Sequence, residues 1–92
     1  MTGTKKWNAE ITITEVGREV TAEARLRGDA SGPLVGHGSA VCKPTDANVP
    51  AIGDELAAAR AFSDLSHQLL QNAAQDIEAH TRQHQPVDGL RV

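Results

Sequence analysis

The chain has 92 residues, a length that fits one domain with a single small core. Trp7 and Phe62 are its only aromatic residues, so the core must be built mainly from Val, Leu, Ile and Ala. The formal net charge is −3, and residues 48–92 carry three basic and six acidic side chains. This acidic second half argues against a nucleic-acid surface on it, because duplex binding depends mainly on cations placed along phosphates.

Cysteine usage and hydropathy indicate a cytoplasmic protein. Cys42 is the only cysteine, which excludes a disulfide framework within one chain and fits a reducing compartment. The N-terminus leads into alternating rather than continuous apolar residues, unlike a signal peptide. No segment approaches the ~20 apolar residues that a membrane span requires, so we expect no membrane partner.

Three strands are expected in the first half of the chain. Apolar and polar residues alternate over 7–15 and again over 19–27, the period of a half-buried strand. Turn-forming residues separate these segments. The third strand is expected over 34–43, and one of its faces carries small residues that include Gly36 and Gly38.

One long helix is expected over 50–81, because Pro50 suits a first helical turn and no breaker follows before Thr81. The tail over 83–92 carries Pro86 and Gly89 and is expected to fray. The sequence therefore predicts one α+β domain over 1–92. Its fold is a three-stranded antiparallel meander followed by one long C-terminal helix packed on one face.

The helix carries two apolar rows. The wider one is expected to face the sheet, with small residues at its centre that approach the backbone at Gly36 and Gly38. These small residues are Ala59, Ser63 and Ser66, and the larger members of the row are Ile52, Leu56, Leu70, Ala73, Ala74 and Ile77.

The second row lies to one side and consists of Phe62, Leu65 and Leu69. It makes the apolar arc too wide for three strands to cover. We interpret this row as a dimer interface; the alternative is that it wraps the edge of the sheet.

The candidate chemistry is sparse. Asp76, His80 and His84 share one side of the helix and could hold a metal, but histidines at a helix end more often face solvent. Cys42 is read as a small buried hydrophobe. Gly36-His37-Gly38 lacks the third glycine and the following helix of a dinucleotide motif. The sequence predicts no catalytic, cofactor-binding or metal-binding residues and no cofactor.

Four segments carry a resemblance to a family of small actinobacterial proteins of unknown function. The segments are 21–26, 35–38, 48–65 and 76–81, and the run Asn48-Val49-Pro50-Ala51-Ile52-Gly53-Asp54-Glu55-Leu56 opens the most specific of them. The resemblance implies a fold similar to a double-stranded-RNA-binding domain and a homodimer. It also implies a link to dormancy and hypoxic stress, and a likeness in shape to ribosome hibernation factors.

The interpretation that follows is a non-enzymatic, homodimeric, stress-associated binding or accessory protein whose protein partner is unknown. The alternative is a ribosome- or structured-RNA-binding factor similar to hibernation factors, although the chain lacks their first helix and basic helix surface. The cations of that alternative would lie on the sheet side: Lys5, Lys6, Arg18, Arg25, Arg27 and Lys43. A small metal-dependent or thiol enzyme is a third class, supported only by Asp76, His80, His84 and Cys42.

Overall fold

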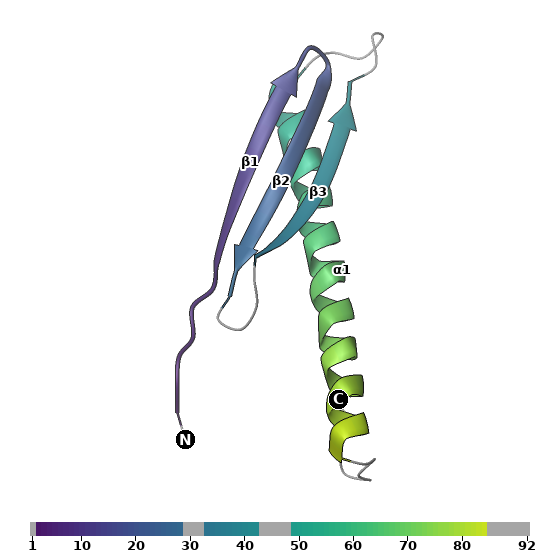
Figure 1. The fold of residues 1–92 in the computed structure, drawn as a ribbon. Coiled ribbons are helices and arrows are strands. Elements are labelled where there is room, and N and C mark those ends of the chain that lie inside the picture. The colour runs from purple at the N-terminus through teal and green to yellow at the C-terminus, as the bar shows by residue number, and fades with distance from the viewer. Residues whose placement is uncertain (1, 29–32, 43–48, 85–92) are drawn as a thin grey trace.

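The computed structural model describes residues 2–28, 33–42 and 49–84. Three strands, β1 (Asn8–Val16), β2 (Glu19–Arg27) and β3 (Leu34–Val41), are followed by one helix, α1 (Pro50–His84). The strands form one antiparallel sheet in the order β1-β2-β3, and α1 lies along one of its faces (Figure 1). This is the α+β arrangement that the sequence predicts.

The bounds of the elements differ slightly from those expected. β3 ends at Val41, and Lys43 lies outside the described residues. α1 continues through residues 83 and 84, which were assigned to the frayed tail, because Arg82 and Gln83 are good helix formers and no breaker intervenes. The rest of the expected tail, 85–92, lies outside the described residues.

A tight turn fixes the register of the first two strands. Val16 pairs with Glu19, so only Gly17 and Arg18 connect β1 to β2. Gly17 has a φ of 61°, in the left-handed region that favours glycine in such turns. The register that follows places Ile11 opposite Ala24, and Ala24 opposite Gly36 on β3.

The core is small and consists mostly of alanine. α1 packs mainly on β2 and β3 and reaches β1 at few points. No described side chain larger than alanine is completely buried. The buried apolar residues of the described chain are Val20, Ala22, Ala24, Ala40, Ala57, Ala61 and Leu65, with Ile11, Leu26 and Leu34 packed at their margin.

Two glycines of β3 bring the helix backbone against the strand. A Cβ at Gly36 would overlap the carbonyl oxygen of Ala61 and would lie 2.6 Å from the backbone nitrogen of Leu65. A Cβ at Gly38 would overlap the carbonyl oxygen of Ala57 and the nitrogen of Ala61. Both glycines are therefore required by space, as the sequence suggested.

The helix residues at this contact are not the expected ones. Ala59, Ser63 and Ser66 are exposed, and Ala57 and Ala61 lie over the glycines instead. The wide apolar row that was expected on the sheet thus faces away from it. Two residues of a strand advance about 6.8 Å and four residues of a helix about 6.0 Å. Because these two advances are similar, helix residues spaced by four (57, 61 and 65) stay level with strand residues spaced by two (38 and 36).

α1 is much longer than the sheet that supports it. Its 35 residues span about 52 Å, whereas a nine-residue strand spans about 30 Å. The molecule is accordingly elongated, with extents of 58 × 25 × 20 Å. The C-terminal part of α1 projects beyond the end of the sheet (Figure 1).

Substituting either contact glycine by alanine should destabilise the fold. Gly36→Ala and Gly38→Ala are each expected to lower the free energy of unfolding by about 1 to 3 kcal/mol, because the new methyl group meets helix backbone that cannot move aside. Urea denaturation measures the change. Gly3→Ala is the matched control, since a Cβ there meets nothing within 4 Å. Unchanged midpoints for both contact variants would contradict the close approach.

Candidate interaction surface

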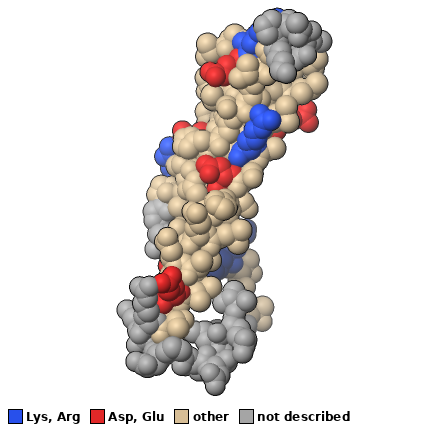
Figure 2. Space-filling model, turned by 90° about the vertical axis from the view of Figure 1, so that its right-hand side faces the viewer, with Lys and Arg blue, Asp and Glu red and all other residues tan. Residues whose placement is uncertain are grey.

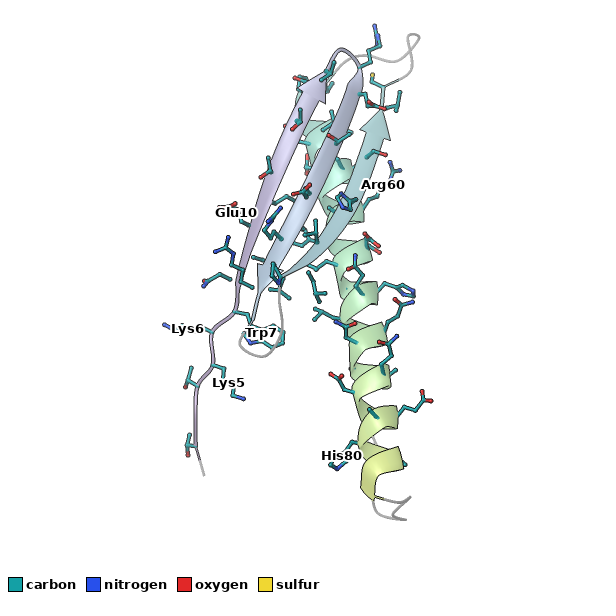
Figure 3. All side chains as sticks on the ribbon, viewed as in Figure 1. Lys5, Lys6, Trp7, Glu10, Arg60 and His80 are labelled. Carbon is teal, nitrogen blue, oxygen red and sulfur yellow. The ribbon has the colours of Figure 1, made fainter. Side chains whose placement is uncertain are left out.

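Side chains of α1 occupy the outer edge of β3. Arg60 Nη1 donates to the carbonyl of Ser39 at 2.6 Å, and the amide of His37 donates to Asp64 Oδ2 at 2.8 Å. Gln68 Nε2 donates to the carbonyl of Val35 at 2.7 Å. Arg60 lies beside the upper part of β3 in Figure 3. The helix thereby makes three of the hydrogen bonds that a fourth strand would otherwise make with this edge.

The sequence did not indicate this role for Arg60, Asp64 and Gln68. The available signal was the spacing of the three polar residues at i, i+4 and i+8, which places them in one row along the helix. Their partners are backbone groups of a strand edge, which no side-chain pattern reveals.

The face of α1 opposite the sheet carries a long apolar stripe. Its large members are strongly exposed: Ile52 by 55%, Leu56 by 45% and Leu70 by 70%. We call this stripe the outer seam. It consists of Ile52, Leu56, Ala59, Ser63, Ser66, Leu70, Ala73 and Ile77, all exposed except the half-buried Ile77.

The outer seam has the spacing of a coiled-coil seam. From residue 52 to residue 77 its members follow one another at intervals that alternate between four and three. This heptad repeat keeps one stripe facing one partner helix along its whole length. Figure 2 shows several separated acidic and basic side chains among mostly uncharged residues on the side of the molecule that lies to the right in Figure 1. The seam is therefore suited to packing against another helix.

The row interpreted as a dimer interface does not form one surface. Leu65 is 5% exposed and belongs to the core, where its Cβ lies near the position that a Cβ of Gly36 would take. Phe62 is 44% exposed and Leu69 is half-buried. The assignment of Leu65 to an interface is wrong, because α1 is turned so that this residue meets the sheet. Phe62 and Leu69 remain accessible beside the outer seam.

The face of the sheet away from α1 carries both signs of charge. Alternation along β2 places Glu19, Glu23, Arg25 and Arg27 on this face, and Glu10 is opposite Arg25 in the register. Arg25 Nη2 lies 3.1 Å from Glu23 Oε1. The two arginines thus stand among three carboxylates.

The other expected cations are dispersed. Lys5 and Lys6 lie on the segment before β1, beyond the end of the sheet (Figure 3). Arg18 Nη1 lies 3.6 Å from Cys42 Sγ at the opposite end of β2. Lys43 is outside the described residues. The described cations therefore do not form a basic stripe across the sheet.

A cavity of about 250 Å³ lies at the start of α1. Its apolar lining comes from Val20 and Ala40 on the sheet and from Val49, Ile52 and Leu56 around the helix start. Ile52 and Leu56 also belong to the outer seam, so this hollow adjoins one end of the stripe. Glu15, Arg18 and Cys42 stand at its polar side.

The residues considered for metal binding do not assemble into a cluster within the described chain. Asp76 and His80 are exposed on the projecting part of α1, and the side chain of His84 lies outside what is described. No three His, Cys, Asp or Glu side chains gather at one point in the described residues. α1, the only helix described, lacks the continuous apolar length that crossing a membrane requires.

Comparison with known proteins shows close relatives over most of the chain. The model of the Rv2632c-like family matches residues 5–87. The uncharacterised protein MT1780 of Mycobacterium tuberculosis (strain CDC 1551 / Oshkosh) is 49% identical over 80 residues, covering 87% of this chain and 82% of the relative. The uncharacterised protein Rv2632c of M. tuberculosis H37Rv is 46% identical over 86 residues, covering 94% and 89%.

A solved structure has the same fold. The crystal structure of Rv2632c superposes with a TM-score of 0.81 at 44% sequence identity, covering 92% of this chain and 98% of that one. The long helix on a three-stranded sheet is thus common to this chain and to that relative.

Removing the edge contact of Asp64 should loosen β3. Asp64→Ala is expected to lower the free energy of unfolding by about 0.5 to 1.5 kcal/mol, since the His37 amide loses its carboxylate acceptor. The same variant should speed hydrogen exchange at the His37 amide, which NMR measures. Asp76→Ala, on the exposed projecting part of α1, is the control and should leave that amide unchanged. Equal exchange in both variants would show that the edge bond is absent in solution.

Proposed function

Because this chain belongs to the Rv2632c-like family, whose relatives named above are uncharacterised, we propose its function from the surface that its fold leaves open. We propose that the protein is a non-enzymatic homodimer acting as a binding or accessory protein, and that the outer seam of α1 is its dimer contact. The observation that carries this proposal is the exposed heptad stripe over residues 52–77.

Exposed apolar side chains that recur along one side of a helix favour association. Single apolar residues on a surface are ordinary, whereas a contiguous apolar patch marks an interaction site. Ile52, Leu56 and Leu70 are exposed by between 45% and 70% and lie on the same stripe. Burying them against a second helix removes this area from water.

Packing against a partner would also stabilise the projecting part of α1. An isolated helix shorter than about 12 to 15 residues is marginal in water, and most helical stability in proteins comes from packing an apolar face. Leu70 and Ala73 lie beyond the contacts that α1 makes with Gly36 and Gly38, and both are exposed. A second helix along the seam would support this segment.

A stress-associated role is the further part of the proposal. The resemblance to dormancy- and hypoxia-linked actinobacterial proteins supports this role. The same resemblance supports the proposed likeness of the fold to a double-stranded-RNA-binding domain. The protein partner would be identified by cross-linking in hypoxic cells that carry either the wild type or a monomeric variant. Cross-links that require both the dimer and hypoxia would support the role, and cross-links independent of both would oppose it.

The dimer prediction concerns the outer seam. The wild type should sediment as a dimer at tens of micromolar, and Ile52→Glu or Leu70→Glu should convert it to a monomer because each buries a charge in the contact. Both residues are exposed in one copy, so the helical circular dichroism should persist. Val16→Glu is the matched control, since Val16 is 71% exposed and Leu70 is 70% exposed. A wild type that sediments as a monomer would refute the proposal.

The RNA prediction concerns the sheet. Its mixed charges can neutralise few phosphates, so generic duplex RNA should bind no more tightly than the ~10⁻⁴ to 10⁻⁶ M range of non-specific binding at physiological salt. Fluorescence anisotropy measures the affinity. Glu10→Lys combined with Glu23→Lys should raise it by adding cations. Submicromolar binding by the wild type with a steep salt dependence would instead favour the ribosome- or RNA-binding alternative.

A further inference from the structure

We infer that two copies of this chain pair their α1 helices antiparallel, about a two-fold axis that passes between Ser63 and Ser66. The inference rests on the proposed homodimer and adds its orientation and register. It comes from the order of large and small residues along the outer seam, which is self-complementary when one copy is reversed.

Reversal brings each leucine of one seam against an alanine of the other, while isoleucine meets isoleucine at the two ends and serine meets serine at the centre. The seam begins and ends with isoleucine, has one leucine and one alanine inside each end, and has serines at its centre. In an antiparallel coiled coil, each layer pairs an a position of one helix with a d position of the other. The layers of this register have that pairing. The layers are Ile52 with the partner's Ile77, Leu56 with the partner's Ala73, Ala59 with the partner's Leu70, and Ser63 with the partner's Ser66.

A parallel pair would stack each residue on its own copy. Leu56 would then meet the partner's Leu56, and Ala59, one layer further, would meet the partner's Ala59. Wide Leu–Leu layers would then be adjacent to narrow Ala–Ala layers, although the distance between two packed helices is set by the side chains at the contact. Voids or overlaps would result, and both destabilise a packed contact. The antiparallel register avoids these Leu–Leu and Ala–Ala layers by pairing each leucine with an alanine.

The flanks of the seam distinguish the two orientations further. In the antiparallel register Phe62 lies beside the partner's Leu69, which extends the apolar contact on one side. Glu55 lies beside the partner's Asp76, and both are exposed acids, so they repel near the two ends of the contact. In a parallel pair Glu55 would lie beside the partner's Arg60 and would attract it. Added salt should therefore strengthen an antiparallel dimer and weaken a parallel one.

The sheets do not interfere with this pairing. Ala57 and Ala61 meet the sheet on one side of α1, and the outer seam lies on the opposite side. A second copy can therefore stack helix on helix, giving four layers in the order sheet, helix, helix, sheet. The projecting part of each helix would then lie along the sheet-supported part of the other.

Exchanging the two members of one layer tests the register. Leu70→Ala alone should weaken dimerisation by at least about tenfold by leaving a void, and Ala59→Leu alone should weaken it by overpacking against the partner's Leu70. The double variant restores one leucine and one alanine to each of these layers and should recover most of the wild-type dimerisation constant. Sedimentation equilibrium measures all four proteins. Failure of the double variant to recover would overturn the register.

A distance between spin labels tests the orientation. Ala51 and Ala79 are exposed and lie off the seam, so each is changed to cysteine on a Cys42→Ser background. In the antiparallel dimer the two Ala51→Cys labels, one in each copy, should be about 40 Å apart, because nearly 30 residues of helix separate their levels along the shared axis. The two labels at residue 79 should be separated by a similar distance for the same reason. In a parallel dimer both distances would fall to about 20 Å or less, because packed helix axes are 8–10 Å apart.

The outcomes separate this inference from the proposed function. A dimer with long label distances, compensation in the double variant and strengthening by salt supports both. A dimer with short distances or without compensation overturns the antiparallel register and leaves the homodimer standing. A monomeric wild type overturns both.

Discussion

The close approach of the helix backbone to β3 is the contact on which the rest of this structure depends. Gly36 and Gly38 have no side chains, and Ala57 and Ala61 have almost none, so two backbones meet with little between them. A larger residue at either glycine would lift the helix off the strand. The three hydrogen bonds between the edge of β3 and the side chains of Arg60, Asp64 and Gln68 also depend on this short separation, since these side chains reach backbone groups directly.

The same contact determines which side of the helix is left for other uses. With Ala57, Ala61 and Leu65 against the sheet, Ile52 and Leu70 of the outer seam are left exposed on α1. The core is correspondingly small and consists mostly of alanine. The apolar side chains that a more common domain of this size would bury, such as Ile52 and Leu70, remain at the surface. The thin core and the exposed stripe therefore both result from the packing of Ala57 and Ala61 on the glycines of β3.

The fold could be predicted from the sequence because strands and helix differ in period and because glycine, proline and turn residues separate them. The rotation of the helix could not, since α1 has apolar residues on two sides and hydrophobicity alone favours the larger ones for the core. Residue size was the better signal: a strand face made of Gly36 and Gly38 accepts alanine at spacing four, as at positions 57 and 61. The edge contacts of Asp64 were hidden because their partner is a backbone amide.

The occupied edge of β3 also limits how this protein could polymerise. A sheet with two open edges can add copy after copy and grow into a fibre. Here helix side chains already bond the carbonyls of Val35 and Ser39 and the amide of His37, which disfavours the addition of a strand at this edge relative to β1. Two copies joined through β1 would present partly occupied β3 edges at both ends, which opposes further growth. One row of polar residues on the helix thus opposes extension of the sheet into a fibre.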